Sequence, residues 1–136
     1  MANACSFEIT VTGPDESVKE MHAFFGPHLK PFVSGYYAKH TLRITDLWPD
    51  FDPKGWVEWI AIGDITHMPN RLRMDGRCNW APPMAFLDRL SKQYPALTIA
   101  ICFHVELMGD PGTYSVCNGS FSLIEYAHGY YLSGSR

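Results

Sequence analysis

Three segments of the chain alternate apolar and polar residues, which is the pattern of a β-strand with one buried face. In residues 5–12, every second residue from Phe7 to Val11 is apolar, and the residues between them are polar. Residues 71–78 and residues 97–107 alternate in the same way. The sequence therefore predicts three strands that each cover a hydrophobic core with one face.

Two further segments carry the start and stop signals of helices. Gly13-Pro14 is followed by two acidic residues, which suit the positive end of a helix dipole, and Gly26-Pro27 provides the stop. This predicts a helix over residues 15–25. Pro82-Pro83 opens a second helix, and Tyr94-Pro95 closes it.

The remaining chain adds a strand, a hairpin and a long connection. Residues 39–45 predict another strand, and Asn118-Gly119 between two strand-like runs is a strong hairpin signal. Residues 46–70 are predicted to be an inserted or loop region, within which residues 56–62 are compatible with either a helix or a strand. Residues 132–136 are predicted to be a loose tail.

The order of these elements predicts one α+β domain over residues 1–136. Two helices on one face of an antiparallel sheet give the split β-α-β arrangement called ferredoxin-like, here with a middle insert and a C-terminal hairpin. In that topology the first strand is central. The strand of residues 71–78 is then expected on one side of it, and the strand of residues 97–107 on the other.

Composition and charge narrow the class of function. The 136 residues are 46% hydrophobic and 18% charged, which is typical of a globular protein. A net charge of −3 argues against a general nucleic-acid coat and against a polybasic membrane binder, and mildly favours protein partners. We see no signal peptide and no apolar run near the roughly 20 residues of a membrane helix. A cytoplasmic protein with four free thiols is therefore expected.

The residues that could carry chemistry do not assemble into a known motif. The six histidines and four cysteines show no metal-site spacing, so no metal and no cofactor are expected. Cys102, His104 and Glu106 share one face of a predicted strand. Neighbours at this spacing are about 6.6 Å apart, which is too far for a direct hydrogen bond. We therefore expect no enzymatic activity and no catalytic residue.

One stretch of the predicted insert interleaves acidic and aromatic side chains. In the first interpretation it is a protein-binding edge, because tryptophans dominate binding hot spots and acidic groups could meet a basic partner. In the second, the aromatic side chains fold back as a small core and leave the acidic groups outside. The candidate partner-binding residues are Asp46, Trp48, Asp50, Phe51, Asp52, Trp56 and Glu58, with Trp59 directly after them.

A second candidate surface lies on the polar face of the predicted sheet. Arg71, Arg73 and Arg77 share one face of their strand, with Glu8 expected on the strand beside them. These arginines could grip phosphate groups or an acidic partner. They could equally form cross-strand ion pairs that only solvate the sheet. The polar faces of the strands at residues 5–12 and 97–107 lack the aromatic residues that an RNA-binding sheet uses, which weakens the nucleic-acid interpretation.

Several motifs resemble the YubB-like family of phage- and plasmid-borne proteins. Residues 1–14 are similar to its N-terminal signature, an M-x-N-W-C-S-N start with a strand that ends in Thr-Gly. Residues 79–83, Asn-Trp-Ala-Pro-Pro, and residues 90–97, Leu-Ser-Lys-Gln-Tyr-Pro-Ala-Leu, resemble its second signature. Further matches are Glu106 with Gly109, and Asn118-Gly119.

The resemblance implies a ferredoxin-like domain on a mobile element, and a biochemical function that is not established in the family. The chain departs from the family pattern at Ala4, where the family has Trp. It departs again at residues 59–65, which replace a W-G-T-K-W segment.

Together these observations predict a non-enzymatic accessory protein that binds and blocks a host protein with fixed stoichiometry. The expected target is a host defence complex such as a CRISPR effector. The alternative is a nucleic-acid-binding module that uses the arginine face. A homodimer also stays open, because exposed strand edges can pair two copies.

Overall fold

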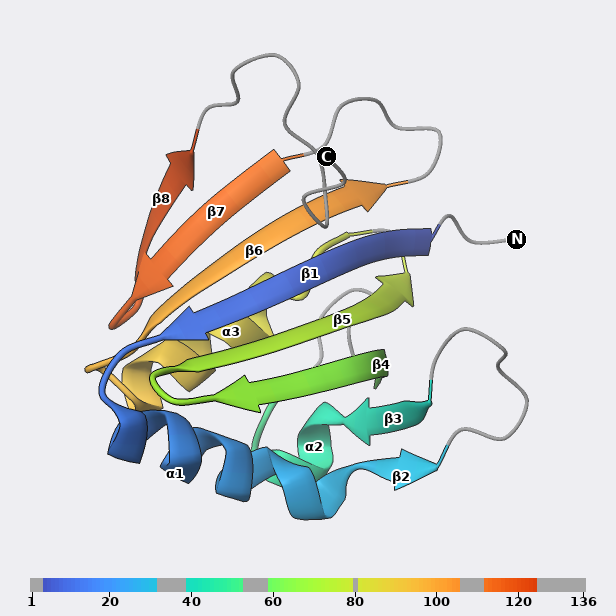
Figure 1. The fold of residues 1–136 in the computed structure, drawn as a ribbon. Coiled ribbons are helices and arrows are strands. Elements are labelled where there is room, and N and C mark those ends of the chain that lie inside the picture. The colour runs from blue at the N-terminus through green and yellow to red at the C-terminus, as the bar shows by residue number, and fades with distance from the viewer. Residues whose placement is uncertain (1–3, 32–38, 53–58, 80, 106–111, 125–136) are drawn as a thin grey trace.

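The computed structural model describes residues 4–31, 39–52, 59–79, 81–105 and 112–124, and these residues form one antiparallel sheet with helices against it (Figure 1). Eight strands run in the order β2-β3-β4-β5-β1-β6-β7-β8. They are β1 (Ala4–Thr12), β2 (Lys30–Pro31), β3 (His40–Arg43), β4 (Trp59–Met68), β5 (Arg71–Asn79), β6 (Thr98–Val105), β7 (Gly112–Cys117) and β8 (Ser120–Ile124). The helices are α1 (Asp15–Phe25), α2 (Ile44–Leu47) and α3 (Met84–Gln93), and a 3₁₀ turn, η1 (Gly26–His28), follows α1.

The predicted central position of the first strand is confirmed. Strand β1 pairs antiparallel with β5 on one side and with β6 on the other. Cys5 lies opposite Cys78 in one ladder and opposite Val105 in the other. Segments far apart in the sequence therefore meet at the middle of the sheet.

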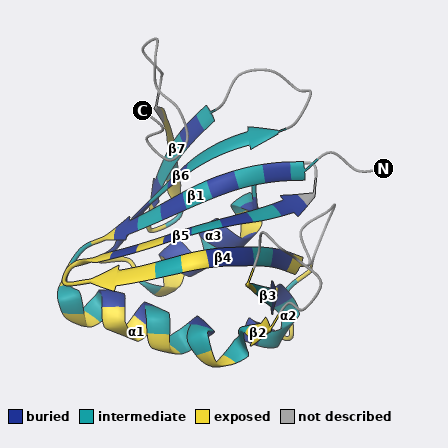
Figure 2. Cartoon of the chain, turned by 45° about the vertical axis from the view of Figure 1, so that its right-hand side comes forward, coloured by how far each residue is buried: buried dark blue, intermediate teal, exposed yellow. Residues whose placement is uncertain are grey.

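Alternation along β1 separates a core face of the sheet from an outer face, as the burial colours of Figure 2 show. The inward residues are Cys5, Phe7, Ile9 and Val11, and all four are buried. Helices α1 and α3 contribute to the same core. Their buried apolar side chains are Val18, Met21 and Phe25 from α1, and Phe86, Leu87 and Leu90 from α3.

Both long helices begin where the sequence predicts. Helix α1 begins after Pro14, with Asp15 and Glu16 in its first turn, and covers the predicted residues. Asp15 also accepts a hydrogen bond from the backbone N–H of Asn70 at 3.3 Å, which ties the helix start to the β4–β5 turn. Helix α3 begins at Met84, directly after the proline pair.

The predicted hairpin is confirmed and is held to α3. Asn118 and Gly119 have φ values of 48° and 80°, as a two-residue turn with both central residues left-handed requires. The backbone N–H of Gly119 donates to the hydroxyl of Ser91 at 2.9 Å. The buried hydroxyl of Ser91 therefore binds the turn to the helix.

Within the predicted insert or loop of residues 46–70, Trp59–Met68 form strand β4 between β3 and β5. This agrees with the strand alternative for residues 59–62 and corrects the loop prediction for residues 63–68. Ile60 and Ile62 face the core, but the register of β4 against β5 then shifts between Ile62 and Ile65. Such a bulge adds one residue to one strand. The apolar residues of β4 therefore lose the two-residue period that identifies a strand in a sequence.

The predicted fold class, α+β with an antiparallel sheet, is confirmed. The described residues form an α+β fold with an antiparallel sheet, and this sheet has more strands than a ferredoxin-like domain. None of the helices in the described ranges has the length and apolar character needed to cross a bilayer.

Candidate functional site

The first half of the acidic–aromatic stretch folds back onto the helices. Trp48 is only 6% exposed, and its ring lies 5.6 Å from that of Phe24, 6.1 Å from that of Phe51 and 5.9 Å from that of Phe86, between centroids. These rings come from α1, α3 and the segment itself. Trp48 is therefore part of the core, where it cannot anchor a partner as the sequence analysis allowed.

Polar contacts fix the same segment from its solvent side. The indole Nε1 of Trp48 donates to Oε1 of Gln93 at 2.9 Å, and the guanidinium of Arg89 lies 5.0 Å from the indole centroid. Arg89 also donates to Oδ1 of Asp50 at 2.9 Å, and this bond holds the pKa of Asp50 below its usual value. One arginine of α3 thus contacts both the buried aromatic residue and the exposed carboxylate.

The remaining predicted partner-binding residues fall into three groups. Asp50 and Asp52 are exposed, while Asp46 on α2 and Phe51 are partly buried. Trp56 and Glu58 lie outside the described residues. The interpretation with aromatic groups inside and acidic groups outside therefore describes residues 46–52.

The second half of the stretch ends on the opposite side of the sheet. Trp59 pairs with Arg43 across β3 and β4, and the guanidinium of Arg43 lies 5.2 Å from the indole centroid. Trp59 alternates with the buried Ile60 and so belongs to the outer face, where it is 48% exposed. The sequence analysis left Trp59 out of the predicted set. Its alternation with Ile60 and Ile62 was the signal that would have placed it outward.

The arginine strand lies as predicted on the outer face of β5. Leu72 and Met74 are buried between the arginines, and Arg71 and Arg73 are exposed. A guanidinium nitrogen of Arg73 donates to a carboxylate oxygen of Glu8 on β1. The expected contact between Glu8 and this strand is therefore made through Arg73.

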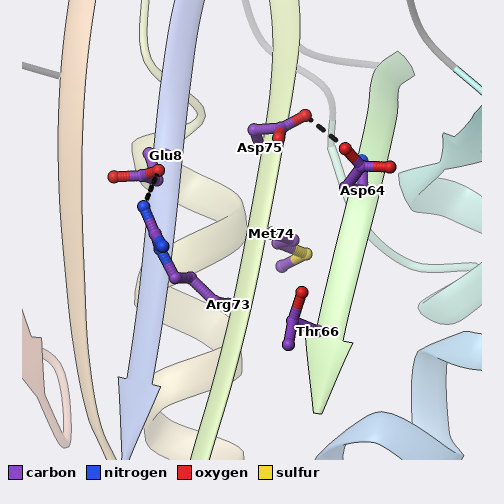
Figure 3. Close-up of a pocket in the computed structure, with 6 residues that line it drawn as sticks. All are labelled: Glu8, Asp64, Thr66, Arg73, Met74 and Asp75. Atoms are coloured by element: carbon purple, nitrogen blue, oxygen red, sulfur yellow. Dashed lines mark hydrogen bonds and ion pairs between the residues drawn. The ribbon is translucent and has the colours of Figure 1, made fainter. Parts of the chain in front are cut away.

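The same ion pair borders an open hollow of about 190 Å³ on the outer face (Figure 3). This is below the roughly 300–1,000 Å³ of small-molecule pockets, so the hollow suits a single side chain better than a whole ligand. Figure 3 shows Arg73 directed at Glu8, and Asp75 directed at Asp64 of β4. The residues that line it are Glu8, Asp64, Thr66, Arg73, Met74 and Asp75.

Hydrogen bonds link the carboxylates of the hollow to the bulge in β4. Oδ1 of Asp75 accepts from the backbone N–H of Asp64 at 3.2 Å. The side chain of Asp64 in turn accepts from Nζ of Lys39 at 2.7 Å, and this hydrogen bond raises the pKa of Lys39. The bulge therefore directs Asp64 toward the outer face and into this set of charges.

Trp59, at the end of the acidic–aromatic stretch, and the arginines of β5 thus lie on the same outer face of the sheet. We call the charged and apolar side chains of this face the outer-face surface. It combines aromatic, apolar, cationic and anionic side chains on neighbouring strands. Its members are Arg43, Trp59, Met68, Arg71, Arg73 and Arg77, together with Glu8, Asp64 and Asp75.

Cys102 and His104, two of the three residues considered for nucleophilic chemistry, lie among the described residues of β6. Sγ of Cys102 lies 3.2 Å from Oγ1 of Thr113, its cross-strand partner on β7. His104 lies opposite Ser6, and Glu106 is outside the described residues. Among the residues that the structure describes, no three His, Cys, Asp or Glu side chains are placed to hold a metal ion.

Comparisons with protein-family models, with curated proteins and with solved structures find no match for this chain. The resemblance to the YubB-like family therefore stays a prediction.

Proposed function

We propose that the protein is a non-enzymatic binding protein that docks onto a target protein through the outer-face surface and inhibits it with fixed stoichiometry. One observation carries this proposal: Trp59 is a large apolar side chain, 48% exposed on the outer face, and the guanidinium of Arg43 lies 5.2 Å from its indole centroid. An exposed tryptophan beside an arginine is the kind of residue that anchors protein interfaces.

The chemistry of the surrounding residues also supports a protein partner. Tryptophan and arginine are the residue types most enriched at binding hot spots, and Arg43 lies against Trp59. The hollow on the same face is lined by Arg73 and by carboxylates of three strands, so the surface carries both signs of charge. A surface with both signs can select a partner with the complementary pattern.

The proposed target class follows from the resemblance. A member of a phage- and plasmid-borne family that acts by binding would act in the cytoplasm of its bacterial host, and a host defence complex such as a CRISPR effector is the target we propose. We also propose a ferredoxin-like core within the larger sheet. The order β4-β5-β1-β6, with α1 and α3 in the connections, supports this assignment.

The first experiment is a pull-down of the tagged protein from bacterial host lysate, with and without nuclease, analysed by mass spectrometry. A target that remains bound after nuclease treatment is then purified, and its affinity for Trp59→Ala is measured by calorimetry. We expect a loss of at least about 30-fold, the size of a hot-spot residue.

The matched control is Leu123→Ala. Leu123 is 63% exposed on β8, on the core face of the sheet opposite Tyr114, and its truncation should leave the affinity unchanged. Equal losses in the two variants, or no loss in Trp59→Ala, would reject the outer-face surface. Reversing the charges of Asp46, Asp50 and Asp52 tests the other side of the molecule, where a large loss would assign binding to the acidic residues instead.

One observation favours the alternative of nucleic-acid binding: Trp59 shares its face with four arginines, and an exposed aromatic ring can stack on a base. Against it, Glu8, Asp64 and Asp75 line the hollow between the strands and would repel phosphate groups. The alternative predicts binding that weakens steeply with salt. A flat salt response, or capture that survives nuclease, excludes it.

A further inference from the structure

Two buried cysteines lie directly opposite each other at one end of the central ladder. Cys5 is the second residue of β1, and Cys78 is the residue before the end of β5. The antiparallel register pairs them, and they are 0% and 7% exposed. Both are free thiols in the structure.

The spacing of such a pair matches a disulfide. Opposite residues on antiparallel strands have Cα atoms about 4.5–5.5 Å apart, inside the roughly 4.4–6.8 Å range of disulfides. Their Cβ atoms, about 4.5–5.5 Å apart, need only a small approach to reach the usual distance of about 3.5–4.5 Å. Both side chains are buried on the same face of the two paired strands. The register therefore places the two thiols next to each other across the ladder.

The two thiols differ in acidity. The hydrogen bond with Cys78 lowers the pKa of Cys5, although burial opposes this effect. The same hydrogen bond and burial raise the pKa of Cys78, whose thiol also lies 2.9 Å from the carbonyl oxygen of Ala81. Cys5 is thus the thiol that ionises first.

We propose that Cys5 and Cys78 are a redox modification site, which a peroxide converts to a reversible intramolecular disulfide. The thiolate of Cys5 attacks one peroxide oxygen, the O–O bond breaks, and Cys5 becomes a sulfenic acid while hydrogen peroxide loses one oxygen as water. Cys78 then attacks the sulfur of Cys5, its thiol proton passes to the departing hydroxide as the S–O bond breaks, and a second water leaves. Two thiols lose two electrons and two protons in total, and the peroxide accepts them.

The position in the fold supports access by a small oxidant. Strand ends fray more easily than strand centres, and this pair lies at the end of the β1–β5 ladder. The other cysteines lack this arrangement: Cys102 lies opposite Thr113, and Cys117 lies opposite Ser120. These two are more exposed, but neither has a cysteine across the ladder.

The experiment uses the Cys102→Ser, Cys117→Ser double variant of the full chain, treated with hydrogen peroxide. We expect an intact mass lower by two hydrogen atoms, one peptide that links residues 5 and 78, and a Tm raised by at least about 5 °C. Dithiothreitol should reverse all three changes. The wild-type chain should form the same linked peptide.

The control adds Cys78→Ser to the double variant. Without a resolving thiol, Cys5 should gain oxygen and give no linked peptide. The proposal is rejected if the double variant gains oxygen without losing hydrogen, or if both thiols are still alkylated after denaturation. It is also rejected if the disulfide forms only in the presence of a denaturant, since the folded ladder would then not hold the pair in place.

Discussion

Truncating Trp48 should destabilise the fold severely, because this side chain joins the segment after α2 to both long helices. A tryptophan buries about 150–250 Å² of surface, and at about 25 cal/mol per Å² this is worth about 4–6 kcal/mol. Measured costs of Trp-to-Ala changes in cores are about 3–5 kcal/mol. Loss of the hydrogen bond to Gln93 adds little to this cost, because the Gln93 side chain is exposed and water can replace the indole as donor. We therefore expect Trp48→Ala to lower the free energy of unfolding by about 4 kcal/mol.

Such a loss is a large fraction of the roughly 5–15 kcal/mol of a typical domain, so a milder variant is needed beside it. Trp48→Phe keeps an aromatic ring near Phe24 and Phe86 and should lose only about 1–2 kcal/mol. Urea unfolding followed by circular dichroism measures both variants without relying on tryptophan fluorescence. Trp59→Ala is the matched control and should lose less than about 1 kcal/mol, because half of its side chain is already in water. A loss below about 1 kcal/mol in Trp48→Ala, with an unchanged m-value, would refute the assignment of Trp48 to the core.

Two other expectations concern single positions of the fold. Gly76→Ala should lower the free energy of unfolding in urea by at least about 2 kcal/mol, because the added Cβ would lie 2.4 Å from the carbonyl oxygen of Ala61. Gly26→Ala is the control and should be close to neutral, because the nearest atom to its added Cβ is 3.9 Å away. Burial, and then the nearby His67, lower the pKa of His22 below 6.5, so the unfolded chain binds a proton more readily and stability should fall as the pH drops from 7.5 to 5.5. His67→Gln should reduce this fall, and a pH response equal to that of the wild-type protein would show that the imidazole contact has no effect.

The elements that the sequence predicted well depend on local signals. Proline and acidic residues set the start of α1, strict alternation identified the strand of the arginines, and Asn118-Gly119 defined the hairpin. Each signal lies within a few residues of the element it determines. Pairing of β1 with β5 and β6 followed from the element order alone, because the split β-α-β arrangement leaves few alternatives.

Strand β4 and the position of its tryptophan depend on contacts that the sequence does not display. The bulge between Ile62 and Ile65 removes the period of two, so the strand is visible only beside its partner. Trp48 and Trp59 also look equivalent in the sequence, since both are large aromatic residues near acidic ones. Only the packing of α1 and α3 shows that Trp48 is covered while Trp59 is left exposed.

The central place of β1 has a consequence for synthesis on the ribosome. Phe7, Ile9 and Val11 are translated early, but the strand that completes their pairing ends at Val105. At about 5–20 residues per second, these apolar side chains wait about 5–20 s for that partner. Translation products that stall before β6 would keep an unpaired edge on β1, and such an edge can pair with another chain and aggregate.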